Sequence, residues 1–275
     1  SDIFSSLISR CSSLLLATGI YPPEIGGPAT YAALVEKELP KWGIAVRVLP
    51  FRTVRSWPTG IRHLLYFLKS FFLAFGRDVV FAQDTISVGL PVMLAAKLLR
   101  KKLIIRVPGD YVWEQAVQRW GVKEGIDDFQ NKKYGRRVEL MRKIQKWVVG
   151  SADLVITPSR YFQKLVSGWV RNKEKVRVIY NGIDLQYQVS GIKYQERGKI
   201  ILSAGRLVPW KVFDTLIELM KELPDWKLVI AGDGPDRERL ELGIRNLELR
   251  DRVTLIGSIS REELLQYLGG ARVFV

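Results

Sequence analysis

The chain has 275 residues, 47% apolar and 26% charged, a balance typical of a globular protein and unlike that of a disordered one. Its single cysteine and single histidine exclude a disulfide framework, a cysteine zinc site and a histidine metal cluster. No apolar run reaches the ~20 residues needed to span a bilayer, and residues 1–13 lack the pattern of a signal peptide.

The positive charge is concentrated in the first part of the chain. The formal net charge is +15, and residues 1–185 carry +14 of it. Such an excess attracts nucleic acid, anionic lipid or a phosphorylated substrate. The basic residues fall mainly on expected helices and loops, not on strands interleaved with aromatic residues, so we expect no nucleic-acid partner.

Short apolar runs alternate with helical patterns along the chain, which predicts an α/β fold with parallel sheets. The expected strands are residues 14–18, 45–50, 79–82, 103–107, 154–157, 176–180, 200–204, 228–231, 253–256 and 273–275. The expected helices are residues 29–39, 61–75, 87–99, 136–149, 160–168, 212–223, 237–247 and 261–268. Residues 120–134 lack clear periodicity, which predicts a long loop or lid.

A loop rich in turn-forming residues follows the first strand and contains Gly26 and Gly27. Glycines before a helix allow backbone N–H groups to approach an anion, but the spacing matches neither a Walker loop nor the dinucleotide fingerprint. Both a phosphate-binding loop and a tight structural turn fit this pattern.

Two later features of the first part also have two interpretations each. The helix at residues 61–75 is rich in large apolar side chains, and it either packs on the sheet or lies in a membrane interface. Asp110, past the fourth strand, either meets a substrate hydroxyl or caps the next helix. The basic helix at residues 136–149 is most simply a solvated face.

A polar segment at residues 184–198 indicates a linker between two domains. We therefore expect two Rossmann-like, doubly wound domains, at residues 1–185 and 186–275. The second opens with a strand, a glycine turn carrying Arg206, a loop carrying Lys211 and an amphipathic helix. Two cations beside a helix N-terminus, at the carboxyl end of a parallel strand, suit a diphosphate. The chain ends inside an apolar strand, so we expect the second domain to be incomplete, with a C-terminal portion missing.

Four segments together resemble the retaining glycosyltransferases of family 4, which have the two-domain GT-B fold. They are residues 19–31, 155–184, 203–214 and 229–235. The resemblance extends over almost the whole chain, and the order and spacing of the motifs make it specific. It implies transfer of a sugar from a nucleotide-sugar, bound mostly by the second domain, to a lipid-linked, polysaccharide or other acceptor with retention of configuration. The implied setting is cell-envelope glycan biosynthesis.

The same resemblance implies roles for individual residues. Arg206 and Lys211 match the family's cations that neutralise the donor diphosphate as the leaving group takes up charge. Gly26 and Gly27 match the glycine loop of the first domain that approaches the donor phosphate or sugar. The positions that match those near the nucleobase are Gly232, Asp233, Gly234, Ile256 and Gly257. No cofactor and no metal are implied.

This sequence departs from the family pattern at three places. Val212 stands where the family usually has a glycine after the lysine, and crowds the helix start. Many members have a histidine after the fourth strand; here a base or acceptor-orienting role falls to Asp110 by position only. The family's paired glutamates would lie beyond Val275, so we expect the chain itself to bind donor weakly and to turn over little or not at all.

Two further interpretations stay open. One is a non-catalytic nucleotide-binding module, favoured by the missing glutamates, and the other is a sugar-nucleotide epimerase of the same architecture. For the transferase we expect a cytoplasmic location, peripheral at an anionic membrane surface. Its expected partners are a nucleotide-sugar and a glycan or lipid-linked acceptor.

Overall fold

A computed structural model describes residues 11–182 and 198–275 of the protein. They form two compact α/β units, and the main division follows Gly182. The predicted boundary after residue 185 lies close to this division and stays a prediction. Apart from Gly198, the predicted link at residues 184–198 lies outside the described residues.

Unit 1 contains a six-stranded sheet in which all neighbouring strands run parallel. Its strands are β1 (Ser13–Thr18), β2 (Ala45–Pro50), β3 (Val79–Ala82), β4 (Lys102–Arg106), β5 (Leu154–Thr157) and β6 (Val176–Val178). Their order is β2-β1-β3-β4-β5-β6. The strand order reverses beside β1, and α/β sheets bind ligands at the carboxyl ends of the strands at such a point.

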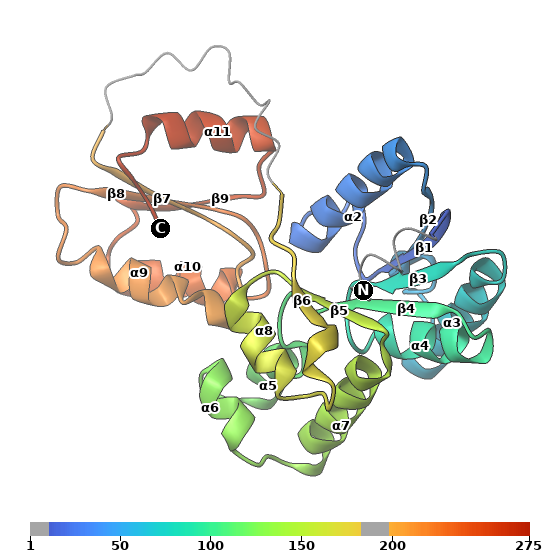
Figure 1. The fold of residues 1–275 in the computed structure, drawn as a ribbon. Helices are drawn as coiled ribbons and strands as arrows, with labels where there is room; N and C mark the ends of the chain where they lie inside the picture. The colour runs from blue at the N-terminus through green and yellow to red at the C-terminus, as the bar shows by residue number, and fades with distance from the viewer. Residues whose placement is uncertain (1–10, 183–197) are drawn as a thin grey trace. The chain divides into compact units, whose positions relative to one another are not determined.

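Helices cover both faces of this sheet (Figure 1). α2 (Gly27–Glu38) packs on one face, where Leu14, Leu16 and Ala32 form an apolar core. α3 (Thr59–Ala74), α4 (Gly89–Leu98) and α7 (Arg136–Ser151) pack on the other, whose core includes Tyr66, Met93 and Val148. α8 (Arg160–Ser167) lies between β5 and β6 in the chain.

The prediction of one long loop or lid at residues 120–134 was wrong in part, because a helix interrupts the loop. α5 (Tyr111–Trp120) ends there, and α6 (Ile126–Asn131) follows. A helix of six residues is too short to show periodicity, and tertiary packing stabilises it: Phe129 is fully buried. The guanidinium of Arg142 stacks on the Phe129 ring at 3.9 Å, so the basic helix α7 is only partly a solvated face.

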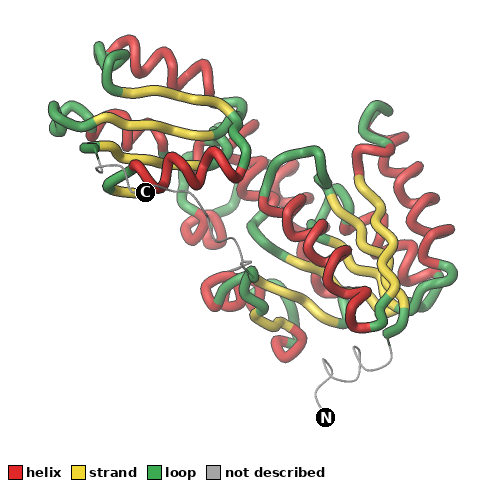
Figure 2. The backbone as a smooth tube through the Cα atoms, turned by 90° about the horizontal axis from the view of Figure 1, so that it is seen from above, coloured by secondary structure: helices red, strands yellow, loops and turns green. Residues whose placement is uncertain are grey.

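Unit 2 contains a four-stranded parallel sheet in the order β10-β7-β8-β9. Its strands are β7 (Ile200–Ala204), β8 (Lys227–Ala231), β9 (Val253–Gly257) and β10 (Val273–Phe274). α9 (Phe213–Leu219) and α10 (Arg237–Asn246) cover one face and α11 (Arg261–Gly270) the other (Figure 1). Figure 2 shows the layers of helix and strand from above. The predicted fold class, two α/β units with parallel sheets, is confirmed.

Candidate functional site

Three loops of unit 2 meet at the carboxyl edge of its sheet, after β7, β8 and β9. Backbone hydrogen bonds hold them together. The bonds run from Gly205 N to Ala231 O (2.9 Å), from Leu207 N to Asp233 O (3.0 Å) and from Gly232 N to Gly257 O (2.7 Å). The structure therefore brings together the segments around Arg206, Gly232–Gly234 and Ile256 that are far apart in the sequence.

Close backbone packing explains two of the predicted glycines. A Cβ atom on Gly232 would lie 1.9 Å from the carbonyl oxygen of Gly205, and one on Gly234 would lie 2.3 Å from that of Leu207. Gly232 also has a φ of +136°, which L side chains rarely adopt. These glycines let the loops approach each other, and their predicted proximity to a nucleobase stays a prediction, as do the roles of Asp233 and Ile256.

Arg206 and Lys211 are both exposed at this edge of unit 2. Cε of Lys211 lies 3.8 Å from the place where a Cβ of Gly205 would be, so the lysine folds back over the turn that carries Arg206. Within residues 11–182 and 198–275 neither cation forms a hydrogen bond or an ion pair. A cavity of about 610 Å³, lined in part by Ser203, Phe213 and Lys211, adjoins the lysine, and Arg206 is not among the residues that line it. Two exposed cations without an acidic partner among the described residues suit an anionic ligand.

Val212, directly after Lys211, has a left-handed backbone with φ 55° and ψ 34°. The expected crowding is therefore backbone strain, which for a β-branched residue costs about 1–2 kcal/mol. Glycine adopts this conformation without strain, which accounts for the residue that the family usually has here.

We expect Val212→Gly to raise the free energy of unfolding by about 1 kcal/mol, because relief of strain outweighs the added freedom of the unfolded chain. Urea denaturation measures the change. Val273→Gly, at an exposed valine of strand β10, is the control and should be destabilising. A Val212→Gly protein no more stable than the original would show that the backbone is not strained.

In unit 1, Gly26 and Gly27 lie at the start of α2. Gly26 has a φ of +154°, and a Cβ there would lie 2.7 Å from Cδ1 of Ile20. Helix α2 begins with neither a side-chain cap nor an acidic residue in its first turn. Tight packing explains Gly26, and an N-terminus of this kind suits an anion, so both interpretations of this loop stand.

Asp110 is only 2% exposed. Its carboxylate accepts hydrogen bonds from Val112 N (3.1 Å), Trp113 N (3.2 Å), Gln130 Nε2 (2.8 Å) and Gln145 Nε2 (2.9 Å). The first two bonds cap α5, and the others join α6 and α7 to it. Of the two interpretations, the geometry favours the helix cap and leaves no carboxylate oxygen turned toward solvent.

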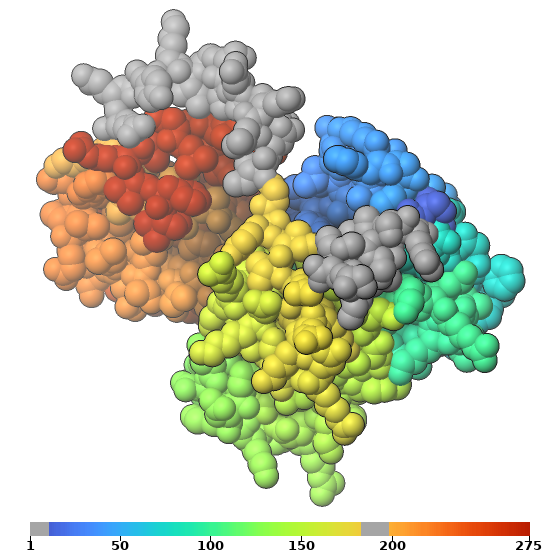
Figure 3. All heavy atoms as spheres, in the orientation of Figure 1, coloured from blue at the N-terminus to red at the C-terminus, as the bar shows by residue number. Residues whose placement is uncertain are grey.

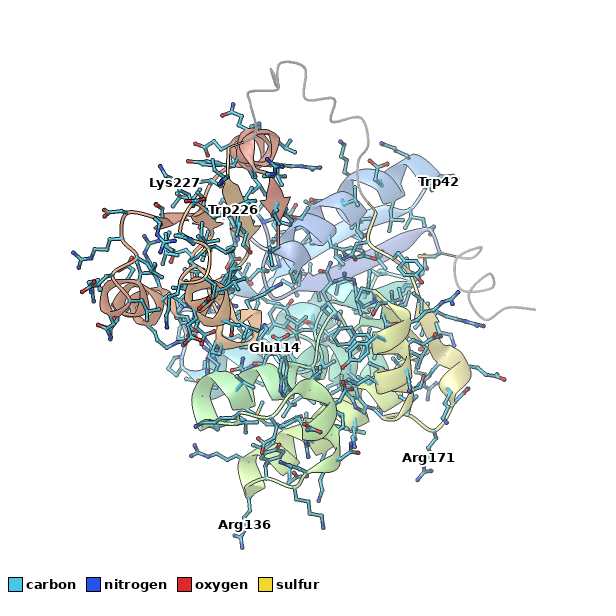
Figure 4. The ribbon with its side chains drawn as sticks, turned by 90° about the vertical axis from the view of Figure 1, so that its left-hand side faces the viewer. Trp42, Glu114, Arg136, Arg171, Trp226 and Lys227 are labelled. Carbon is cyan, nitrogen blue, oxygen red and sulfur yellow. The ribbon has the colours of Figure 1, made fainter. Side chains whose placement is uncertain are left out.

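Glu114, one turn further along α5, is the partly exposed carboxylate beside the end of β4. Its Oε1 lies 2.5 Å from the place where a Cβ of Gly109 would be, so it covers that glycine. Figure 4 labels the residue. Sequence reasoning did not single it out, although its position four residues after Asp110 puts it on the same helix face.

The expectation that no metal takes part in the reaction stays a prediction.

Comparison with protein families gives two matches. The model described as Glycosyltransferase Family 4 matches residues 25–187, and the one described as Glycosyl transferases group 1 matches residues 190–275. The alpha-monoglucosyldiacylglycerol synthase of Streptococcus pneumoniae is 26% identical over 94% of this chain and 64% of its own length. The D-inositol 3-phosphate glycosyltransferase of Mycolicibacterium smegmatis is 30% identical over 44% of this chain and 31% of its own. The chain thus spans less than two thirds of these relatives.

Solved structures share the fold. HepE of Anabaena, in complex with UDP and glucose, is 17% identical, with a TM-score of 0.65 over 96% of this chain and 73% of that one. The catalytic domain of starch synthase IV from Arabidopsis thaliana, bound to ADP and acarbose, is 12% identical, with a TM-score of 0.65 over 96% and 77%. These likenesses confirm the GT-B fold. Since a family model covers more than half of the chain, this protein belongs to glycosyltransferase family 4.

Proposed function

We propose that unit 2 binds a nucleotide-sugar and that the whole protein transfers the sugar, with retention of configuration, to a lipid-linked or polysaccharide acceptor held by unit 1. The setting is cell-envelope glycan synthesis. The observation that carries this function is the pair of exposed cations, Arg206 and Lys211, beside three joined loops at the carboxyl edge of a parallel sheet. The complex of HepE with UDP-glucose supports it.

In this reaction the bond between the sugar C1 and the diphosphate oxygen breaks, while the acceptor hydroxyl passes its proton to the departing diphosphate and its oxygen forms a new bond to C1. Negative charge then develops on the departing diphosphate. Arg206 and Lys211 stabilise that charge in place, so the proposal needs neither a metal nor a cofactor. In unit 1, Glu114 is better placed than the buried Asp110 to contact an acceptor hydroxyl.

A screen of nucleotide-sugars by isothermal titration calorimetry tests this function. We expect weak binding overall, with one donor bound more tightly than its free nucleoside diphosphate, since the sugar adds contacts. Equal affinity for both would favour the non-catalytic nucleotide-binding module. Failure of every nucleotide and nucleotide-sugar to bind would contradict a donor site in this chain. A putative UDP-N-acetylglucosamine 2-epimerase of Listeria monocytogenes is also similar, at 13% identity, and this likeness extends to the fold alone.

We further propose that unit 1 docks on an anionic membrane through α3. Large apolar side chains recur along one face of this helix and are 40–73% exposed. This apolar stripe consists of Ile61, Leu64, Leu68, Phe72 and Phe75. Figure 3 shows the atoms of this segment, in blue-green, at the right-hand side. An exposed stripe of this length marks an interaction surface.

The charge around the stripe favours lipid as the partner. Residues 51–77, which contain α3, include five lysines and arginines and no aspartate or glutamate. Cations beside an apolar helix face are typical of helices that lie in the headgroup region of anionic bilayers. None of the helices within the described residues has the length and hydropathy to cross a bilayer.

We expect the double variant Leu68→Glu/Phe72→Glu to lower the partition coefficient onto phosphatidylglycerol vesicles about tenfold or more, because two apolar groups and the local charge balance are lost. Vesicle sedimentation measures it. Leu140→Glu/Leu242→Glu, at two exposed leucines outside the stripe, is the matched control and should bind as the original protein does. Equal loss in both variants would argue against the stripe.

A further inference from the structure

A row of polar side chains crosses the carboxyl edge of the unit 1 sheet on the face covered by α2. In the parallel register Ala17 lies beside Ala82, and Ala82 beside Ile105. One residue further along these strands is a polar row that consists of Thr18, Gln83 and Arg106. The side chains share the face of Leu16, Phe81 and Ile104, which pack toward α2.

Two members of the polar row are buried with unused hydrogen-bonding groups. Gln83 is 2% exposed, and neither Nε2 nor Oε1 has a partner among the described residues. Arg106 is 3% exposed, and its Nε has no partner there either. Buried polar groups without partners are unfavourable, and an uncompensated buried charge is more so. Groups left unpaired in this way call for a partner, which can be a water, an ion or a ligand.

No carboxylate within the described residues forms an ion pair with Arg106. The guanidinium stacks on the ring of Tyr31 in α2 at 4.0 Å, and Nη2 donates to Asn181 Oδ1 at 2.7 Å. Burial lowers the pKa of Arg106. Asp84, next to Gln83, is occupied elsewhere, because its Oδ1 accepts from backbone N–H groups at the start of α4.

The row has one end at the surface. Asn181 is exposed, and its bond to Arg106 is the link between solvent and the buried guanidinium. An anion that enters at this end exchanges with the amide oxygen of Asn181 and brings the charge that Arg106 lacks. Gln83 then donates from Nε2 to the same anion and keeps Oε1 for a hydroxyl of the ligand.

We propose that the polar row, with Asn181 as its entrance, binds a phosphate or carboxylate group of the acceptor. This assignment rests on the proposed function, in which unit 1 holds the acceptor. The donor diphosphate already has its own cations, Arg206 and Lys211, in unit 2. The row lies wholly within unit 1. It selects an acceptor by the acceptor's anionic group, which is a different group from the hydroxyl that receives the sugar.

The experiment measures binding of inorganic phosphate by titration calorimetry at fixed ionic strength. It uses the Arg206→Ala/Lys211→Ala background, so that phosphate cannot bind at the cations of unit 2. Adding Arg106→Met should raise the Kd for phosphate at least about tenfold, as loss of a charge-assisted bond predicts. Gln83→Leu should raise it severalfold, and because it removes unpaired buried atoms it should not lower the melting temperature.

Arg136→Met is the matched control, because Arg136 extends from the start of α7 away from the rest of unit 1 (Figure 4). It should leave phosphate binding unchanged. Glycerol 3-phosphate and glucuronate, as two further probes, distinguish a phospholipid headgroup from an acidic sugar as the source of the anion. Unchanged phosphate affinity in both Arg106→Met and Gln83→Leu, or no phosphate binding in the background protein, would overturn the proposal.

The two proposals fail in different ways. With Arg206 and Lys211 intact, Arg106→Met should still bind UDP. If no nucleotide binds but phosphate binding still depends on Arg106, the donor function fails and the anion site stands. If Arg106→Met does not fold, as judged by circular dichroism, Gln83→Leu decides the matter because it leaves the arginine in place.

Discussion

Removing both Arg206 and Lys211 should weaken binding of UDP about a hundredfold or more, and removing Lys211 alone about tenfold. A charge-assisted hydrogen bond contributes about 1.5–3 kcal/mol, and each 1.4 kcal/mol changes an equilibrium constant about tenfold. The two side chains are exposed and make no bonds within the described parts of the chain, so their loss should leave the fold intact. Titration of UDP into the wild type, Lys211→Ala and the double variant measures the effect.

Two controls sharpen this result. Lys227→Ala removes another exposed lysine of unit 2, but at the amino end of β8, opposite the loops (Figure 4). It should bind UDP as the wild type does. Uridine, which lacks the diphosphate, should bind weakly to all variants alike. If the double variant keeps the affinity of the wild type for UDP, the diphosphate does not lie between these cations.

Replacing Asp110 by alanine should lower the free energy of unfolding by about 3 kcal/mol or more. The change removes a helix cap and takes the Asp110 acceptor away from the buried amide of Gln145 and the half-buried amide of Gln130. These glutamines extend the network, since Gln145 also accepts from Thr85 Oγ1 and Gln130 from Trp169 Nε1. Chemical denaturation measures the loss.

Asp128→Ala, at an exposed aspartate in the first turn of α6, is the control and should change stability by less than about 0.5 kcal/mol. Asp110→Asn should fall between the two, because an amide keeps one acceptor oxygen but turns its NH₂ toward other donors. An Asp110→Ala protein as stable as the wild type, yet inactive in sugar transfer, would favour the catalytic interpretation instead.

The parallel sheets followed directly from the sequence, because each buried strand is a short apolar run ended by a turn residue. The loops of unit 2 were also predictable as separate motifs. Their mutual contact was not, since it depends on backbone atoms of Gly205 and Leu207 that approach Gly232 and Gly234. Sequence alone left Asp110 undecided, because its partners Gln130 and Gln145 come 20 and 35 residues later.

Other features had only weak signals in the sequence. The six residues of α6 are held by packing around Phe129, which no local pattern reveals. Arg106 is the last residue of a strand. Only the register of the strands shows that it stands beside Gln83, and no carboxylate among the described residues pairs with it. At Val212 the departure from the family's glycine predicts crowding, and the backbone angles show that the crowding is a left-handed conformation.

The central claim is that the edge of unit 2 at Arg206 and Lys211 holds the diphosphate of a nucleotide-sugar. A crystal structure of the protein with UDP tests it most directly. The phosphate oxygens should lie within about 3 Å of the Arg206 guanidinium and of Lys211 Nζ. Phosphates bound elsewhere, with both cations turned to solvent, would contradict the claim.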